Sequence, residues 1–436
     1  MDHSLIFTLV ILWVIVFFML GQAVATVMMG AGFLGLALWL GPKTLMGIVG
    51  QDVFFSVSNY PLSIIPLYLL MAQFLVRGKI VGDLFRVGHR LAGYRRFPLG
   101  VAAILTGGMR GAVSGSGSAS AAALARLATP ELERVGYTRD FSAGLAAISG
   151  SLSAIIPPSL LLMIYGSITL VPIGHLFIGS IGPAVLCILV YIVCLRFMGE
   201  TTPGAADRAA PLEEEDPAAL RRSFLAMGFI VVLMTIVFGG IYGGIFTVGE
   251  AGGLGAFTAM VGVIAMGRVN GKDIADALVD AAKITAMLLM IIMAAQIFSR
   301  FMSISRVPQL LVDLTIPLQA YPVLLLLGLM VVLFLAGMAL EEVTCIILII
   351  PLIEPVLRAA EIDMIWFGVM ACFVISLGLL TPPVGLVAFS AAVAANVPPG
   401  AVFRPALKFA TVAAVIVVLA MVFVPGIVTW LPSRLN

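Results

Sequence analysis

The sequence predicts an all-α, polytopic membrane protein whose two halves repeat the same order of spans, re-entrant hairpin and broken helix. Its composition is 61% hydrophobic and 11% charged, with a mean hydropathy of +1.17, whereas soluble domains carry about 25% charged residues. Runs of the roughly 20 apolar residues that cross a bilayer recur along the chain. Two proline pairs, Pro157–Pro158 and Pro382–Pro383, interrupt such runs and lie 225 positions apart, the spacing that also separates Pro130 from Pro355.

The first half, residues 1–198, opens on an apolar segment that we interpret as a membrane helix rather than a removed signal, because no small-residue cleavage site precedes a polar domain. A later apolar stretch is interrupted by small and charged residues, and we expect it to fold as a hairpin that enters and leaves on one side. The first proline pair divides another span. The expected elements are spans at 5–20, 23–41, 61–77 and 174–198, a hairpin at 97–135 and a broken helix at 139–166.

A hydrophilic connector, 199–222, separates the halves and contains the acidic run Glu213–Asp216. A charge block of this kind is typical of a solvated segment, so we interpret the connector as the linker. Sequence identity between the halves is low, and the evidence for a duplication is the pattern of helix lengths and prolines. In the second half, 223–436, the expected elements are spans at 223–239, 251–267, 284–302 and 403–431, a hairpin at 321–360 and a broken helix at 363–394.

The charges after the third span predict the orientation. Short cytoplasmic loops are enriched in Lys and Arg, so we place this loop and the linker in the cytoplasm and the N-terminus outside. The second hairpin then enters from the face opposite the first, which makes the halves inverted repeats. Amphipathic stretches at 78–96 and 303–320 could be interfacial helices or plain surface loops, and we favour helices. Against Asp83, the loop holds six cations, Arg77, Lys79, Arg86, Arg90, Arg95 and Arg96.

The two proline breaks carry the functional prediction. Proline removes an amide donor and clashes with the preceding turn, and unpaired backbone in hydrocarbon is tolerated only against protein or a wet cavity. Interrupted helices at corresponding places in two halves indicate an ion and substrate site near mid-membrane. The sequence therefore predicts a transporter, not an enzyme. The formal charge of +2, without a basic stripe, gives no sign of nucleic-acid binding, and the three scattered histidines do not suggest a metal site.

Glycine and serine dominate the tip of the first hairpin, from Gly107 to Ser120. Glycine permits a tight turn with positive φ, and serine hydroxyls with freed carbonyls are the oxygen ligands that hard cations prefer. Close packing of small residues between helices is the simpler explanation. Because the Pro157–Pro158 break lies in the same half, we favour an ion site.

Arg110, Glu341 and Glu342 are charged residues in otherwise apolar hairpins, and an intramembrane charge is a functional candidate by default. The two carboxylates could bind a cation or proton, pair with Arg110, or cap a helix. Arg110 could bind an anionic substrate in two-pronged fashion or neutralise one of these carboxylates. The half-helix after Pro158 would offer free amides, which also favour a carboxylate ligand.

Together these motifs resemble the large membrane subunit of tripartite ATP-independent periplasmic (TRAP) transporters, the DctM-like permeases. The resemblance runs along nearly the whole chain, and the combination is specific although no single motif is. The matching segments are Gly111–Ser120, Gly136–Tyr137, Ile155–Ser159 through Tyr165–Gly166, Gly244–Ala251, Phe367–Met370 and Gly378–Gly385.

The resemblance implies a fold of the ion-transporter superfamily that works as an elevator, in which two hairpins and two broken helices move against a scaffold. It implies Na⁺-coupled symport of organic anions such as C4-dicarboxylates across the bacterial inner membrane, with no cofactor beyond Na⁺. The implied partners are a small four-helix membrane subunit and a periplasmic substrate-binding protein, besides the organic anion itself and membrane lipid.

Carried over by position, the family's sodium sites lie between hairpin tips and broken helices, with the substrate beside them. The residues implied for sodium are Ser114, Ser116, Ser118, Ile155, Pro157, Gly337, Thr344, Gly378 and Thr381. The residues expected to contact substrate are Arg110, Pro158, Ser159, Glu341 and Pro383.

Two other functions are compatible with parts of the sequence. A stand-alone divalent-anion symporter of related architecture would need no binding protein. A channel or a structural subunit of a respiratory complex would also be strongly apolar, but the paired helix breaks argue against a merely structural role. The sequence does not name the substrate.

Overall fold

The computed structural model describes residues 3–58, 60–93, 95–201 and 217–434. Within them the regular secondary structure is helical, and the only β contact is one isolated antiparallel bridge between Tyr137 and Thr201. The all-α prediction is therefore confirmed. The acidic run of the predicted linker lies outside the described residues.

The first half begins with three helices, two of them close to expected spans. The 3-10 turns Tyr60–Ser63 and Leu152–Ala154 separate α3 from α4 and α8 from the first break. The helices are α1 (His3–Met19), α2 (Val24–Leu40), α3 (Pro42–Ser58), α4 (Ile64–Arg77), α5 (Ile80–Ala92), α6 (Arg96–Ser114), α7 (Gly117–Arg134), α8 (Arg139–Ser151), α9 (Leu160–Thr169) and α10 (Ile173–Met198).

The second half repeats this order. Its last long helix passes through a π turn, Ala414–Val418, and the chain ends in a 3-10 turn, Pro432–Arg434. The helices are α11 (Pro217–Tyr242), α12 (Val248–Ala265), α13 (Gly271–Ile304), α14 (Val307–Gln319), α15 (Pro322–Ala339), α16 (Glu342–Ala359), α17 (Met364–Gly378), α18 (Leu386–Ala395), α19 (Pro399–Ala413), α20 (Leu419–Phe423) and α21 (Gly426–Thr429).

The element bounds keep the 225-residue offset found in the sequence. It carries the starts of α6, α7, α8 and α9 to within one residue of those of α15, α16, α17 and α18. One difference stands out, because α3 and α4 correspond to the single 34-residue helix α13. Proline cannot continue a helix without losing a hydrogen bond, and Pro61 lies between α3 and α4, whereas α13 contains no proline. Helix α3 was not among the expected spans.

Six helices among the described residues are long and apolar enough to cross a membrane, or seven if the bent pair α4 and α5 is counted as one span. The pair bends by 58°. Lys79, directly before α5, has a φ of +54°, and Arg306, directly before α14, has a φ of +59°. Left-handed backbone ends a helix, so the two predicted amphipathic stretches form separate helices at the same place in each half.

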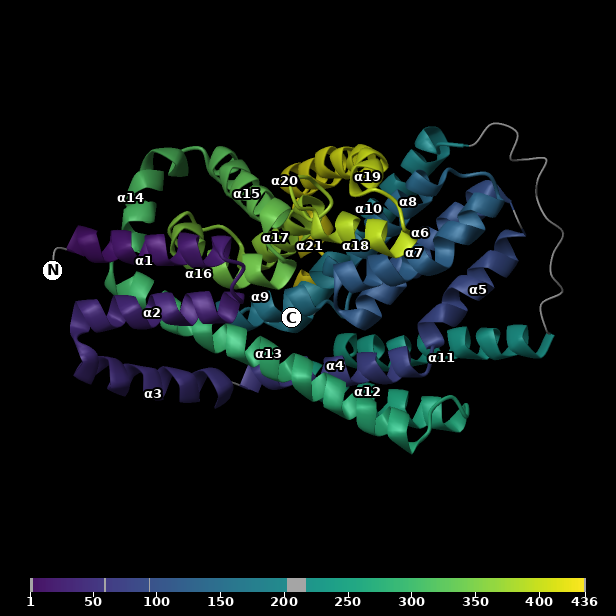
Figure 1. Cartoon of the computed structure of the whole chain (residues 1–436), viewed down its shortest axis with the longest axis horizontal. Helices are drawn as coiled ribbons and strands as arrows, with labels where there is room; N and C mark the ends of the chain where they lie inside the picture. Colours follow the sequence, from purple (N-terminus) through teal and green to yellow (C-terminus); the bar gives the residue numbers. More distant parts are fainter. Residues whose placement is uncertain (1–2, 59, 94, 202–216, 435–436) are drawn as a thin grey trace.

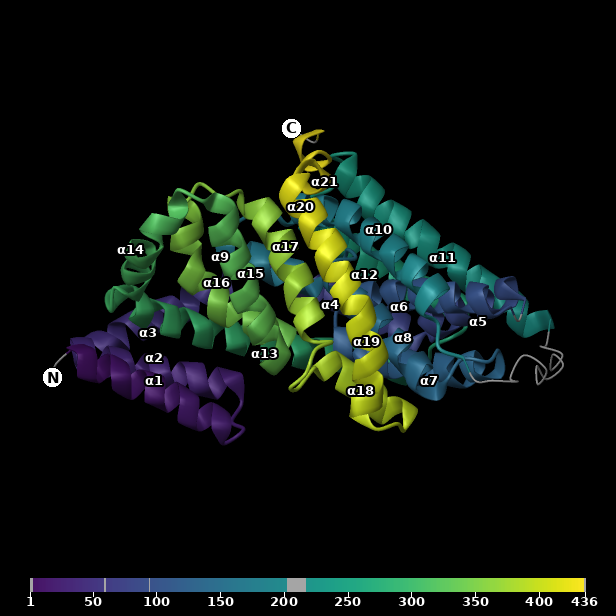
Figure 2. The same ribbon diagram turned by 90° about the horizontal axis from the view of Figure 1, so that it is seen from above.

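The hairpins and broken helices lie together in the middle of the molecule. Figure 1 shows α1, α2 and α3 at one end and α5 with α11 at the other, while α13 runs beneath from one region to the other. Figure 2 shows α19 and α20 crossing the centre beside α17 and α18. Helix α8 is buried from Phe141 to Ser151, and α17 from Phe367 to Gly378. These two helices therefore form the core around which the other elements pack.

Small residues allow α2 to lie close to α13. A Cβ atom on Gly35 would overlap the ring of Phe301, and one on Gly32 would meet the backbone of Ile297 at 2.9 Å. Phe301 is fully buried, so its ring has little room to move. Membrane helices, which lack a hydrophobic driving force for association, use such small residues for close packing.

We expect Gly35→Ala to destabilise the protein, because the added methyl group overpacks a fixed aromatic contact, at a cost of about 1–3 kcal/mol. The matched control is Gly228→Ala in α11, where the new methyl group meets nothing within 4 Å and should be neutral or slightly stabilising. Thermal unfolding of the purified proteins in detergent is the measurement. Equal melting temperatures for both variants would contradict the close α2–α13 contact.

Candidate functional site

The tip of the first hairpin is a tight turn between α6 and α7. Gly115 ends α6 with a φ of +68°, a conformation that favours glycine, and its N–H donates to the carbonyl of Gly111 at 2.9 Å. Ser116 caps α7 by accepting from the N–H of Ala119 at 3.4 Å, and its hydroxyl lies 3.3 Å from that of Ser118. The predicted sodium ligands Ser116 and Ser118 are thus adjacent, whereas the side chain of Ser114 lies outside the described residues.

The tip of the second hairpin is built around Glu341. Its carboxylate accepts from the N–H groups of Val343 at 3.0 Å and Thr344 at 3.3 Å, so it caps the start of α16. A carboxylate at this place also complements the positive end of the helix dipole. Of the alternatives that the sequence left open, helix capping is the one that this geometry displays for Glu341. Its predicted contact with substrate stays a prediction.

The second break is tied to the second hairpin by its backbone. The N–H groups of Val384 and Gly385 both donate to the carbonyl of Met338, at 3.2 and 3.3 Å. Thr381 closes the end of α17, because its hydroxyl donates to the carbonyl of Leu377 at 3.0 Å. The orphaned groups that a broken helix leaves in hydrocarbon are thereby paired inside the protein. Pro383, a predicted substrate contact, is exposed at this break.

Two glycines bring hairpin and broken helix into contact in the second half. A Cβ atom on Gly378 would lie 2.9 Å from the Cα of Gly337 and 2.6 Å from the carbonyl oxygen of Phe334. Gly337 and Gly378, both implied as sodium-binding by the resemblance, are therefore packed directly against each other. No larger side chain fits here without separating the hairpin from the break.

The first break is closed by a serine. The hydroxyl of Ser159 donates to the carbonyl of Ala154 at 2.7 Å and accepts from the N–H of Leu162 at 3.3 Å, so it spans the break and caps α9. Both breaks contain a cis peptide bond between their two prolines. Gly111 and Gly108 of the first hairpin pack against Ser153 and Ile156 at this break. Ile155 and Pro158 are buried in it and Pro157 is half-buried.

Both hairpins and both broken helices meet at Gly117, the first residue of α7. Its N–H donates to the Oε1 atom of Glu342 at 3.1 Å. A Cβ atom built on Gly117 would lie 3.2 Å from the Oγ of Ser153, 3.3 Å from Val387 and 3.5 Å from the Oε2 of Glu342. These residues come from the second hairpin, the first broken helix and the half-helix after the second break. We call Gly117, Ser153, Glu342 and Val387 the Gly117 junction.

The Gly117 junction holds polar atoms that the protein alone does not saturate. The Oγ of Ser153 is buried and has no hydrogen-bond partner. Glu342 is 6% exposed, and the hydrogen bond from Gly117 engages only its Oε1 atom. Burying a hydroxyl or a carboxylate without a partner is costly, and an orphaned atom in a native site calls for a ligand, an ion or a water. Ser153 was missed in the sequence analysis, although it stands in a row of serines before Pro157.

Arg110 lies apart from this junction. It lines a cavity with Asp83, Arg86, Arg222 and Arg268, and no residue of either proline break borders that cavity. Within the described part of the chain, Arg110 forms no ion pair with Glu341 or Glu342, whose carboxylates are engaged as described above. The predicted neutralisation is thus not formed in this conformation, and the role of Arg110 as a substrate ligand stays a prediction.

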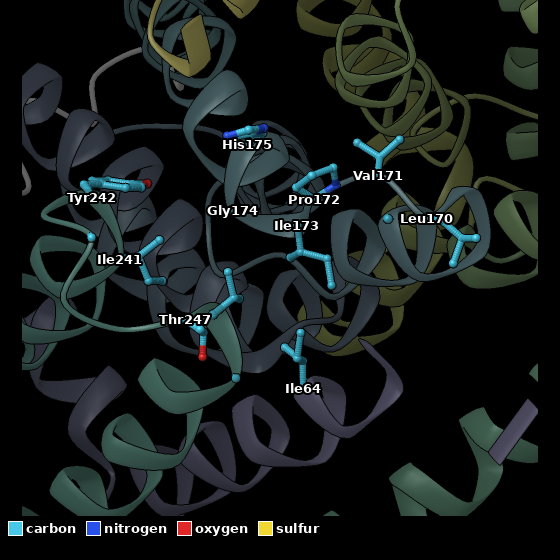
Figure 3. Close-up of a pocket in the computed structure, with 14 residues that line it drawn as sticks. Ile64, Leu170, Val171, Pro172, Ile173, Gly174, His175, Ile241, Tyr242 and Thr247 are labelled. Atoms are coloured by element: carbon cyan, nitrogen blue, oxygen red, sulfur yellow. The ribbon is translucent and has the colours of Figure 1, made fainter. Parts of the chain in front are cut away.

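A second cavity, of about 500 Å³, lies between the loop from α9 to α10 and the loop from α11 to α12. Figure 3 shows the side chains of His175 and Tyr242 at its border, with Ile173 and Ile64 below them. The hydroxyl of Tyr242 is buried without a hydrogen-bond partner. Both loops lie at the ends of α10 and α11 that are farther from Met198 and Pro217, the residues that flank the linker side of these helices.

A helical membrane protein with two hairpins and two broken helices around polar, unsaturated atoms is a membrane permease by its architecture. The chain belongs to the family described as tripartite ATP-independent periplasmic transporter, DctM component, which it matches over residues 11–427. The predicted recognition is thus confirmed. Membership makes the chain a multi-pass permease of the inner membrane and not an enzyme. It also implies secondary transport with a periplasmic binding protein and a small membrane subunit.

Curated relatives agree with this assignment. The C4-dicarboxylate TRAP transporter large permease protein DctM of Pseudomonas aeruginosa is 29% identical over 385 residues, covering 88% of this chain and 89% of that protein. The sialic acid TRAP transporter large permease protein SiaM of Vibrio cholerae is 26% identical over 387 residues, covering 87% and 88%. The crystal structure of the YdaH transporter of Alcanivorax borkumensis is similar in fold, with a TM-score of 0.62 at 14% identity over 88% of this chain and 90% of that one.

We expect Ser153→Ala to leave the melting temperature in Na⁺-free buffer unchanged or higher, because the variant removes a buried hydroxyl that has no partner. Ser159→Ala is the matched control in the same break. It loses a capping hydroxyl with two hydrogen bonds and should cost about 1–2 kcal/mol. Thermal unfolding of both purified variants is the measurement. Equal losses of stability would mean that Ser153 has a protein partner after all.

Proposed function

We propose that the protein imports an organic carboxylate together with Na⁺, after a periplasmic binding protein has delivered the substrate, and that it works by an elevator movement. The observation that carries the proposal is the Gly117 junction. There both hairpins and both broken helices meet around the buried carboxylate of Glu342, which accepts one hydrogen bond from Gly117, and the buried hydroxyl of Ser153, which has no protein partner.

Sodium fits the donors that the junction offers. Ser153 and Glu342 supply oxygen atoms, from the first broken helix and the second hairpin. Hard cations prefer such ligands. Among the described residues no group of three or more His, Cys, Asp or Glu is gathered, so neutral oxygens would have to complete the coordination, which suits a monovalent cation. A bound Na⁺ would also offset the cost of burying the Glu342 charge.

An organic carboxylate as substrate is supported by the relatives. The proteins from Pseudomonas aeruginosa and Vibrio cholerae are named for C4-dicarboxylate and for sialic acid, and both compounds carry a carboxylate. The half-helices after the breaks begin at Leu160 and Leu386, and helix starts favour anions. A carboxylate that binds beside Na⁺ would therefore interact with the positive charge of the ion and with the positive ends of these helices.

An elevator movement is supported by the separate helices α5 and α14. Each follows the third span of its half, after a residue with left-handed backbone, and leads directly into a hairpin. In the proposed mechanism, these helices join a scaffold to a moving unit that holds the Gly117 junction. The cavity in Figure 3, at the ends of α10 and α11 away from the linker, would then face the binding protein.

A direct test separates this function from its nearest alternative. The chain and its small membrane subunit are reconstituted in proteoliposomes, and uptake of a radiolabelled dicarboxylate is measured with a Na⁺ gradient, with and without the binding protein. We expect uptake only when both the gradient and the binding protein are present. Uptake without any soluble protein would instead support a stand-alone divalent-anion symporter.

We expect Ser118→Leu and Thr381→Val each to raise the Na⁺ concentration needed for half-maximal uptake by roughly tenfold, because each removes a hydroxyl proposed to face the cation and a contact to a charge is worth about 1.5–3 kcal/mol. Ser305→Ala is the control, since its hydroxyl donates to Met302 far from both breaks. Uptake in proteoliposomes at graded Na⁺ is the measurement. Wild-type Na⁺ dependence in both variants would refute the assignment of these two ligands.

A further inference from the structure

A strongly basic cavity lies where α5, α6 and α11 meet the end of α12. Its volume is about 570 Å³, and its charged lining consists of Lys79, Arg86, Arg110, Arg222 and Arg268 against the single carboxylate of Asp83. Clustered arginines around a cavity at the end of membrane helices favour an anion, phosphate above all, because guanidinium groups match it in geometry as well as charge.

Asp83 does not neutralise this cavity. Its carboxylate is buried and already accepts from Arg268, from Arg86 at 2.8 Å and from the hydroxyl of Ser223 at 2.7 Å. Lys79 and Arg110 have no acidic partner within the described part of the chain. The cavity therefore keeps an excess of positive charge that an external anion can balance.

An apolar groove of about 530 Å³ is formed by the same three helices. Val87 and Leu91 line it from α5, Leu105 from α6 and Val231 from α11. The two cavities are bordered by the same three helices, on which Arg86 is followed by Val87 and Arg110 is preceded by Met109, which also lines the groove. A cationic cavity and an apolar groove with common walls match an amphiphile with an anionic head.

Helices α11 and α6 each line both cavities with successive stretches of sequence. The membrane-spanning part of α11 runs from Leu220 to Tyr242. Arg222 is near its start and lines the basic cavity, whereas Met227 and Val231 follow further inside and line the groove. On α6 the order is reversed, because Leu105 and Met109 line the groove and Arg110, which follows them, lines the basic cavity.

We propose that the region where α5, α6 and α11 meet binds an anionic phospholipid, with the phosphate in the basic cavity and one acyl chain in the apolar groove. Basic pockets between membrane helices on the cytoplasmic side are known to hold anionic headgroups, and each buried methylene of the acyl chain adds to the affinity. Neither proline break contributes a lining residue to this site, and Arg110 is the one predicted substrate ligand that it includes.

Lipid retention by the full chain tests the proposal. The purified protein is exchanged into detergent with dioleoyl phosphatidylglycerol or dioleoyl phosphatidylcholine, and bound lipid is counted by native mass spectrometry. We expect phosphatidylglycerol to be retained in preference to phosphatidylcholine.

The double variant Lys79→Gln with Arg110→Gln should retain roughly tenfold less phosphatidylglycerol, since each cation near a headgroup contributes to attraction. Lys43→Gln with Arg404→Gln, which removes the same two charges at exposed places outside the cavity, should retain it like the wild type.

Two further experiments distinguish a bound lipid from a bound soluble phosphate. Leu105→Trp fills the groove from an exposed position (43%) without changing a charge, and it should lower retention of phosphatidylglycerol. Inorganic phosphate at millimolar concentration should not displace the lipid. Displacement by phosphate, together with normal retention by Leu105→Trp, would overturn the proposal in favour of a soluble-anion site. Equal retention of both lipids by the wild type would overturn it outright.

Discussion

The structure depends on one constraint, that backbone groups exposed by a broken helix must find partners inside the protein. In hydrocarbon an unpaired N–H or carbonyl costs several kcal/mol. The second break meets this demand by directing two N–H groups at the carbonyl of Met338 in the neighbouring hairpin. The first uses the hydroxyl of Ser159. In the second half, hairpin and broken helix are therefore held together by the same bonds that make the break tolerable.

The same bonds explain why polar chemistry is concentrated at the Gly117 junction. Most groups at the tips and breaks are saturated, as the caps at Ser116, Ser159 and Glu341 illustrate. What is left over is a single hydroxyl, on Ser153, and part of the Glu342 carboxylate. A site defined by what its surroundings leave unpaired is selective, since only a ligand of the right charge and size can complete it.

Much of the fold could be predicted from the sequence, because apolar runs and prolines report directly on membrane helices and their breaks. The hairpins followed from apolar stretches interrupted by small and charged residues, and the 225-residue offset followed from Pro130, Pro355 and the two proline pairs. Helix α3 was missed, since 42–58 is less apolar than its neighbours.

The site was harder to predict, because capping and orphaned atoms are tertiary properties. Nothing in the local sequence separates Ser153 from Ser149, whose hydroxyl donates to Leu145, and Arg110 faces a different cavity from the one expected.

The hydrogen bond between Gly117 and Glu342 joins positions that are equivalent under the offset of the two halves, which are 225 residues apart. A chain with two identical halves could not form it. Two glycines facing each other would leave an amide without an acceptor, and two glutamates would bring like charges together in a buried place. The favourable contact depends on the two equivalent positions holding different residues. At the Gly117 junction, Gly117 and Glu342 thus occupy equivalent backbone positions in the two halves but have different side chains.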